Sequence, residues 1–504
     1  MHMGLAERIR TVLDLDPTKG AIEFKGHWYS WGEVKACMTG IDDILDTANL
    51  GEGAPVAIIL RNRPAHAAAV VEVLASRRCV ASVNPFQGGE KIAADIGGLN
   101  VGAVIADAED WANPHLQEIV SARGMVGIQL TSGDTLNAKR ITENAAPGKP
   151  PYHEPLPETA ILMLTSGTTG PAKRIKLPYQ SFQKALLSTK KTDGAIKLQD
   201  GVAVLSGPLV HIGGMYFTVD SVIHGRSFCL MEKFSVPEWV RIVSTYKPKV
   251  GSLPPTAIRM VMDAEVPVDA LSSLTCVIAG SAPLPVDLQE RFESHYGIPI
   301  LDVYGATEFG GGITSWNLKD HREFAKTKRG SVGRAQPGVA LRVVDIDTGE
   351  ELPVGSEGVL EVQSAQSGQE GWVRTTDLAL LDEDGFLFLK GRADDAIVRG
   401  GFKVLPREVE KVIQEHPWVQ AACVVGIPDE RLGAVPQAAV QLKEGAPAIT
   451  PEELSQFVRS KVVAYQVPTK FIIVDELPRT PSLKVSFYEV KQLLAASADQ
   501  AKSA

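Results

Sequence analysis

The residues best suited to chemistry form a run rich in glycine and hydroxyl side chains, preceded by a short apolar stretch, 160–164, that is typical of a buried strand. The run consists of Thr165, Ser166, Gly167, Thr168, Thr169, Gly170 and, three positions further on, Lys173. Glycine lets the backbone bring several N–H groups close to one ligand, and the hydroxyl groups add donors. The pattern predicts a phosphate-binding loop, although its spacing is not that of the Walker motif.

Three more glycine-rich or polar segments each follow a predicted strand. They are residues 208–214, 280–283 and 304–308, after strands expected at 202–205, 274–279 and 298–303. Ligands of open parallel sheets bind in the crevice outside the carboxyl ends of the strands. We therefore expect four loops, including the phosphate-binding loop, to converge on one site.

The elements that position these loops alternate between strand and helix. Residues 55–60, 65–76 and 80–83 read as a β-α-β unit, and a capping box with an internal proline, at 235–238, opens a helix to about residue 246. Residues 330–390 read as hairpins, with Asp384-Gly385 as a turn. The last 110 or so residues read as an α+β unit.

These patterns predict an α/β protein in two parts. Residues 1–393 form a large N-terminal domain of doubly wound α/β subdomains plus a small β-barrel, and residues 394–504 form a smaller α+β C-terminal domain. A length of 504 residues is consistent with two to four compact units.

Bulk properties exclude several classes of function. The net charge of −9 and the lack of a basic run argue against a nucleic-acid partner. Five scattered cysteines fit reduced thiols in a protein core. The sequence has neither a signal-peptide pattern nor an apolar window long enough to span a membrane, so a cytoplasmic location is expected.

Taken together, five motifs resemble those of the adenylate-forming superfamily, which includes acyl- and aryl-CoA synthetases, peptide-synthetase adenylation domains and beetle luciferases. The motifs are residues 165–173, 304–308, 372–377, 391–395 and 478–484. The resemblance implies a mobile C-terminal domain and a two-step reaction. A carboxylate attacks the α-phosphorus of MgATP, giving an acyl-adenylate and pyrophosphate, and a thiol then displaces AMP.

The resemblance also assigns nucleotide-binding residues. Thr307 contacts the α-phosphate, Tyr304 stacks near the adenine next to Gly305, and Glu308 helps to hold Mg²⁺. A carboxylate near phosphates needs such a cation to offset their repulsion. Further ATP- or AMP-binding candidates are Gly280, Ser281, Ala282 and Pro283 beside the adenine, Asp302 at the base edge, Asp377 on the ribose hydroxyls and Arg392 on ribose or phosphate.

Catalysis and the other substrates are assigned in the same way. Lys484 resembles the catalytic lysine, with Thr307, Glu308 and His211 as further catalytic candidates, and Asp394 resembles the hinge. The residues that match the coenzyme A tunnel are Gly400, Gly401, Phe402 and Lys403. Those that match the acid pocket are His211, Ile212, Gly213, Gly214, Gly310, Gly311 and Gly312. The many glycines predict a wide pocket for a bulky aryl or polycyclic acid.

Three positions depart from the resemblance, because Arg174, Thr376 and Leu483 stand where glycine is usual. A lost glycine restricts backbone angles, so the loop geometry at these positions is in question. The favoured function is an ATP-dependent acid–CoA ligase that uses Mg²⁺, ATP, coenzyme A and a carboxylic acid. Transfer of the acyl group to a carrier protein, a weakly catalytic nucleotide-binding protein and a homodimeric state all stay open.

Overall fold

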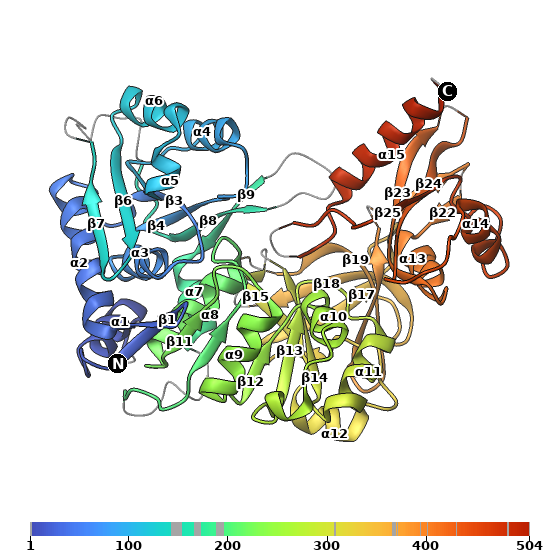
Figure 1. Ribbon diagram of the computed structural model, residues 1–504, viewed down its shortest axis with the longest axis horizontal. Coiled ribbons are helices and arrows are strands. Elements are labelled where there is room, and N and C mark those ends of the chain that lie inside the picture. The colour runs from blue at the N-terminus through green and yellow to red at the C-terminus, as the bar shows by residue number, and fades with distance from the viewer. Residues whose placement is uncertain are drawn as a thin grey trace.

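The computed structural model describes residues 3–142, 154–165, 173–187, 196–306, 309–364, 369, 371–393, 395–400, 402–429, 431–480 and 483–502. The N-terminal part, at left and below in Figure 1, is built on α/β sheets, and the C-terminal lobe lies at upper right. Among the described helices, none combines the length and apolarity needed to cross a bilayer.

The first sheet has seven strands in the order β7-β6-β5-β3-β4-β8-β9, parallel except for its two outer pairs. Its strands are β3 (Pro55–Ile59), β4 (Cys79–Val83), β5 (Ala103–Asp107), β6 (Val126–Ser132), β7 (Leu136–Arg140), β8 (Thr159–Thr165) and β9 (Lys173–Pro178). Its helices are α1 (Leu5–Leu13), α2 (Trp31–Thr47), α3 (Pro64–Ala75), α4 (Gly89–Gly97), α5 (Ala108–Trp111), α6 (Pro114–Ala122) and α7 (Tyr179–Leu187).

Both faces of this sheet are buried, as in a doubly wound fold. Val56 and Ile58 of β3 belong to one apolar cluster, together with residues of α2 and α3, whereas Ala57 and Ile59 belong to another, with residues of α4 and α6. Alternate residues of a strand point to opposite faces, so one short apolar strand supplies both cores.

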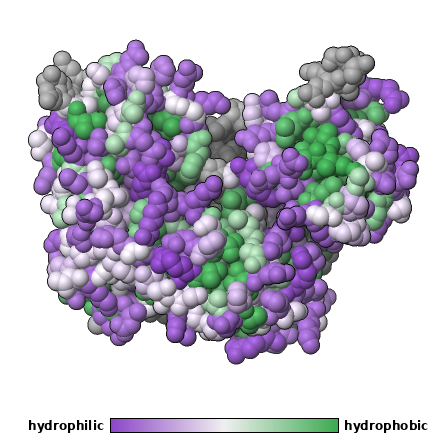
Figure 2. All heavy atoms as spheres, viewed as in Figure 1, coloured by the Kyte–Doolittle hydropathy of each residue, from purple (hydrophilic) through white to green (hydrophobic). Residues whose placement is uncertain are grey.

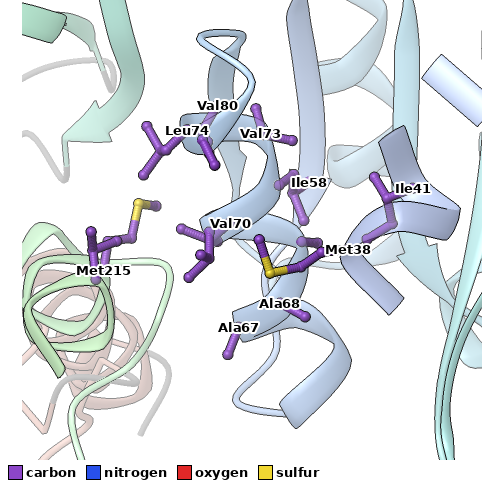
Figure 3. Close-up of a cluster of buried hydrophobic side chains, with 14 of the residues drawn as sticks. Met38, Ile41, Ile58, Ala67, Ala68, Val70, Val73, Leu74, Val80 and Met215 are labelled. Atoms are coloured by element: carbon purple, nitrogen blue, oxygen red, sulfur yellow. The ribbon is translucent and has the colours of Figure 1, made fainter. Parts of the chain in front are cut away.

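Helix α3 is buried along its whole length, which its almost entirely apolar sequence requires. Figure 3 shows its Val70 and Leu74 between Met38 of α2 and Met215 of α8 (Ile212–Ile223). This packing fixes α8 against the first sheet. His66 of α3 is buried, with Nε2 3.0 Å from Oδ2 of Asp107.

A second sheet of four strands and a third of five continue the N-terminal part, in the orders β10-β11-β1-β2 and β12-β13-β14-β15-β16. Their strands are β1 (Gly20–Phe24), β2 (His27–Ser30), β10 (Ala203–Leu205), β11 (Phe228–Leu230), β12 (Val250–Ser252), β13 (Cys276–Gly280), β14 (Ile300–Ala306), β15 (Gly311–Ser315) and β16 (Arg334–Ala335). Helices α9 (Val236–Tyr246), α10 (Pro255–Asp263), η2 (Val268–Leu271), α11 (Val286–Tyr296) and α12 (Leu318–Phe324) accompany the third sheet.

An antiparallel sheet follows, in the order β17-β18-β19-β20. Its strands are β17 (Val339–Val344), β18 (Glu357–Ser364), β19 (Val373–Leu381) and β20 (Leu387–Arg392). The expected hairpin turn at Asp384-Gly385 joins β19 to β20. Among the described residues β17 does not pair with β20, so closure into a small β-barrel stays a prediction.

The C-terminal lobe is an α+β unit, as expected. Its sheet has the order β22-β21-β24-β23, with β25 parallel to β24. Its elements are β21 (Ile397–Arg399), β22 (Phe402–Val404), α13 (Pro406–Gln414), β23 (Val419–Asp429), β24 (Gly433–Leu442), α14 (Pro451–Arg459), β25 (Phe471–Val474) and α15 (Phe487–Lys502).

One local prediction is wrong. Helix α9 begins where the expected capping box lies, but the side chain of Ser235 makes no capping hydrogen bond. The proline in the first turn lacks an N–H group and already favours the helical φ, so this helix can start without the box.

Candidate functional site

A cavity of about 3750 Å³ lies between the N-terminal sheets and the C-terminal lobe, where Figure 2 shows the surface hollowed. Three of the four predicted loops, 208–214, 280–283 and 304–308, contribute to its lining, together with the antiparallel sheet and the C-terminal lobe. The end of β8, which precedes the phosphate-binding loop, also lines it, while residues 166–172 of that loop lie outside the described part of the chain. Lining residues include Leu164, Pro208, His211, Gly213, Gly280, Ser281, Asp302, Tyr304, Gly311, Asp377, Arg392 and Lys484. The structure therefore brings most of the described candidates to one place.

The loop after β13 lies against the next strand, β14. Gly280 is paired with Val303 in this parallel register, and a Cβ on Gly280 would lie 3.0 Å from the Val303 carbonyl oxygen. The following residue, Ser281, has a φ of +69°, which is uncommon outside glycine. Such strained conformations gather at ligand-binding sites, so the backbone supports the assignment of this loop as a binding element.

The ribose and adenine candidates are joined by a direct hydrogen bond. The hydroxyl of Tyr304 donates to Oδ2 of Asp377 over 2.6 Å, and Asp377 is paired with Arg392 across β19 and β20. Strand geometry places paired residues side by side, so these three side-chain positions form one group. Stacking of the Tyr304 ring on adenine stays a prediction.

Asp302 is the most perturbed carboxyl group of the cavity. It is buried within β14, where Oδ1 accepts a hydrogen bond from the Val303 N–H over 3.0 Å. Burial raises the pKa of Asp302 to about 7, since the charged form loses its hydration. Near neutral pH this group can therefore either donate or accept a proton.

His211 stands at the start of α8 without making a side-chain capping bond. Its Nε2 is buried and has no hydrogen-bond partner among the described residues. Burial, and secondarily the charge of Lys484, lowers the pKa of His211 to about 4. The imidazole is therefore neutral at pH 7 and offers the cavity one donor and one acceptor.

Asn62 holds the loop that carries His211. Its side-chain amide donates to the carbonyls of Gly207 and Met231, each over 3.0 Å, and its oxygen accepts from the Leu209 N–H over 2.7 Å. The side chain is buried, so these bonds are shielded from water. Sequence reasoning missed Asn62; the signal was a polar residue just past the carboxyl end of a parallel strand, β3.

Lys484 reaches the cavity from the C-terminal lobe. Burial lowers the pKa of its ammonium group, whose charge in turn acts on His211. The loop before it contacts α10, where the Thr256 hydroxyl donates to the Leu483 carbonyl over 3.2 Å. Lys484 and His211, 273 positions apart in sequence, thus share one site.

The glycines assigned to the acid pocket do not all serve the same purpose. A Cβ on Gly213 or Gly311 would meet nothing within 4 Å. A Cβ on Gly214 would lie 2.1 Å from the Pro208 carbonyl oxygen, and one on Gly312 would lie 2.9 Å from the Val303 side chain. Gly213 and Gly311 therefore keep space open, whereas Gly214 and Gly312 allow close packing.

Of the three departures from the glycine pattern, only one requires an unusual backbone. Arg174 and Thr376 lie within strands β9 and β19. Arg174 adds a clamp, since it donates to the Ser82 carbonyl over 2.7 Å and to Asp95 over 2.6 Å. Leu483 alone has a left-handed φ, +62°.

Several assigned residues fall outside the described part of the chain. These are Ser166, Gly167, Thr168, Thr169, Gly170, Thr307, Glu308, Asp394 and Gly401. For Thr165, Lys173 and Lys403 the structure describes the backbone but not the side chains. Phe402 does not line the cavity; its side chain is 58% exposed and stacks on Tyr465. The structure thus does not bring Phe402 to the other site residues.

Within the described residues, no group of three or more histidine, cysteine or acidic side chains could hold a metal ion. The predicted Mg²⁺ ligand, Glu308, is outside that part. Among the described carboxylates of the cavity, Asp377 and Asp302 already accept hydrogen bonds. The assignment of Glu308 to Mg²⁺ therefore stays a prediction.

A large cavity at the strand ends of α/β sheets, lined also by a second lobe that carries a lysine, suits a nucleotide-binding enzyme. The model of the AMP-binding enzyme family matches residues 10–369, and that of the AMP-binding enzyme C-terminal domain matches residues 408–484. The chain belongs to the AMP-binding enzyme family.

Curated relatives are acyl- and aryl-CoA ligases. The long-chain-fatty-acid–CoA ligase of Bacillus subtilis is 31% identical, over 66% of this chain and 62% of that protein. The 2-succinylbenzoate–CoA ligase of Bacillus pumilus is 32% identical, over 67% of this chain and 69% of that protein. The chain thus aligns with less than two thirds of the first of these proteins.

Solved structures share the whole fold. The ATP-bound MatB from Rhodopseudomonas palustris superimposes with a TM-score of 0.82, at 24% identity, over 98% of this chain and 99% of that one. At this level of sequence identity, the similarity shows a common fold. The expected combination of a large α/β part and a smaller α+β lobe is confirmed.

Proposed function

We propose that the protein is an ATP-dependent acid–CoA ligase that forms AMP. In the first step a carboxylate attacks the α-phosphorus of ATP and pyrophosphate leaves; in the second the sulfur of coenzyme A attacks the acyl carbonyl and AMP leaves. Phosphoryl-type transfer requires positioning and charge neutralisation more than covalent help. The names of the curated relatives support coenzyme A as the acceptor.

The observation that carries the proposal is the meeting of two groups in one cavity. Tyr304 and Asp377, the proposed nucleoside residues, are hydrogen-bonded to each other, and the charge of Lys484 acts on His211 in the proposed acid pocket. A carboxylate attacking a phosphate brings two anions together. An ammonium group held between them offsets that repulsion.

His211 and Asn62 act around this charge. The neutral imidazole of His211 can hydrogen-bond the acid without adding a second positive charge, and Asn62 keeps its loop in place. Mg²⁺, held by Glu308, would neutralise phosphate charge when bound. We further propose that the domain boundary lies at residues 393 and 394, with Asp394 as the hinge and Gly400 to Lys403 on the coenzyme A side.

The acid is assigned only by pocket shape. Gly213 and Gly311 leave open space where side chains would project, which supports a bulky aryl or polycyclic acid rather than acetate. One relative acts on long-chain fatty acids and another on 2-succinylbenzoate, both larger than acetate. This substrate class belongs to the proposal.

The test is pyrophosphate release with ATP, Mg²⁺ and a panel of acids from acetate to polycyclic acids, followed by thioester formation with coenzyme A. The proposal predicts release that depends on a bulky acid, and a thioester once coenzyme A is added. Release without thioester would favour a carrier protein as acceptor. Nucleotide binding without release for any acid would favour a non-catalytic binding protein.

A further inference from the structure

Leu483, just before Lys484, adopts a backbone conformation that its side chain disfavours. Its φ is +62°, whereas leucine normally avoids the left-handed region because its Cβ crowds the backbone. A residue keeps such a strained backbone conformation only where several contacts with its surroundings hold it there. The contacts of Leu483 therefore indicate what holds this part of the chain.

Hydrogen bonds hold both the N–H group and the carbonyl oxygen of Leu483. Its N–H donates to the Thr480 carbonyl over 2.8 Å. Its carbonyl accepts from the Thr256 hydroxyl over 3.2 Å and from Nη1 of Arg479 over 3.1 Å. Arg479 also donates to the Thr256 hydroxyl over 3.2 Å, so three residues close a small ring of hydrogen bonds between the lobes.

The side chain of Leu483 anchors the same point. It packs against a buried apolar cluster of the N-terminal part, to which Ile258 of α10 and Leu288 of α11 belong. Burial lowers the pKa of Arg479, and no carboxylate lies within ion-pair distance of it among the described residues. Its hydrogen bonds are instead directed at Thr256 and Leu483.

We propose that Leu483, Thr256 and Arg479 form an interlobe latch that places Lys484 in the cavity for acyl-adenylate formation. Leu483 and Thr256 are positioning residues: neither carries the charge, but the backbone angles at Leu483 set the direction in which Lys484 leaves the loop. The expected effect of the latch on reaction rates rests on the proposed function. The latch itself is inferred from the contacts alone.

The kinetic test compares Thr256→Val and Leu483→Gly with wild type in the two half-reactions, assayed separately. Thr256→Val removes the hydroxyl at nearly constant volume, and Leu483→Gly removes the anchor. Glu265→Gly is the matched control, since Glu265, just after α10 in the N-terminal part, is exposed and also has a left-handed φ, 48°, but lies outside the latch.

We expect both latch variants to lower kcat for acid-dependent pyrophosphate release about tenfold, with KM for ATP changed less than twofold. Thioester formation from synthetic acyl-adenylate and coenzyme A should continue at the wild-type rate or faster, and the control should match wild type in both. Equal slowing of both half-reactions, or no slowing in either, would overturn the proposal.

A second readout is independent of activity. A released loop exposes the peptide bonds after Arg479 and Lys484 to trypsin, so we expect faster cleavage there in both latch variants than in wild type or the control. If wild type released no pyrophosphate with any acid, the proposed function would be wrong. The comparison of cleavage rates would still test whether the latch exists. Unchanged cleavage in both variants would refute it.

Discussion

Asp302 shows how the fold sets the charge of single residues at the site. Its carboxyl group is buried within β14 and, among the described residues, receives one hydrogen bond, from the neighbouring Val303 N–H. Its raised pKa therefore reflects lost hydration rather than a neighbouring charge. A group of this kind links the stability of the protein to pH.

We predict that Asp302 destabilises the folded state as pH rises. Its folded pKa, about 7, lies above the unfolded value near 4, so its stabilising contribution is complete below pH 4 and is lost as pH rises through 7. The free energy of unfolding of wild type, measured relative to Asp302→Asn, should therefore fall between about pH 4 and pH 7 and level off above that range. Other buried carboxyl groups, such as Glu72, cancel in this difference. A constant difference would show that Asp302 is ionised throughout.

The paired glycines 213 and 214 allow a test of pocket width with an internal control. Gly213→Val should fold normally, because its Cβ meets nothing within 4 Å, and should lower kcat/KM for bulky acids at least tenfold while sparing small ones. Gly214→Ala forces a contact of 2.1 Å with the Pro208 carbonyl and should lower Tm and activity toward every acid. An unchanged acid profile for Gly213→Val would place the acid elsewhere.

At the scale of elements, the site depends on loops that are held by residues from other elements. Asn62, at the end of β3, fixes the loop between β10 and α8, and Arg174, on β9, ties that strand to Ser82 of β4 and Asp95 of α4. These bonds join segments far apart in sequence, so the loop between β10 and α8, and the strand β9, are held in place by the fold itself.

Asn62→Ala should separate loop positioning from chemistry. The substitution leaves the Leu209 N–H and two carbonyls without their partner, and a buried unsatisfied group costs about 1–3 kcal/mol. We expect a lower Tm and an increased KM for the acid, with KM for ATP changed much less. Asn62→Asp, which keeps the acceptor for Leu209, should recover part of the loss. Equal increases in KM for the acid and KM for ATP would instead show a general loss of stability.

The sequence predicted the elements and their order well, because apolar runs and turn residues are local signals. The β-α-β unit at 55–83 and the Asp384-Gly385 hairpin are confirmed. The expected convergence of loops followed from the rule for parallel strands, and the cavity lining supports it. Ser235 failed as a cap because proline already favours the helix start.

What the sequence could not give are contacts between distant segments. Asn62, Thr256 and Arg479 are ordinary polar residues locally, and only the fold shows them holding loops. The sequence also did not indicate which of the three positions without the usual glycine has a strained backbone. Arg174 and Thr376 lie in strands, whereas Leu483 has a left-handed φ. Backbone angles at a single residue depend on tertiary contacts that no local pattern records.

At the scale of the whole molecule, the cavity exists only because two lobes meet. The nucleoside candidates come from the N-terminal sheets, whereas Lys484 comes from the C-terminal lobe and contacts α10 through its loop. Phe402, assigned to coenzyme A, lies on that lobe away from the cavity. This arrangement suits the proposed first half-reaction, for which we place Lys484 next to the acid and the phosphate.

The most direct test of the account is the rate of Lys484→Ala in each half-reaction. Removing one preorganised charged donor from such a site costs about 3–4 kcal/mol, so acid-dependent pyrophosphate release should fall about 10²–10³-fold. Thioester formation from synthetic acyl-adenylate and coenzyme A should stay close to that of wild type. Equal loss in both half-reactions, or full pyrophosphate release by the variant, would contradict the role assigned to Lys484 and to the cavity.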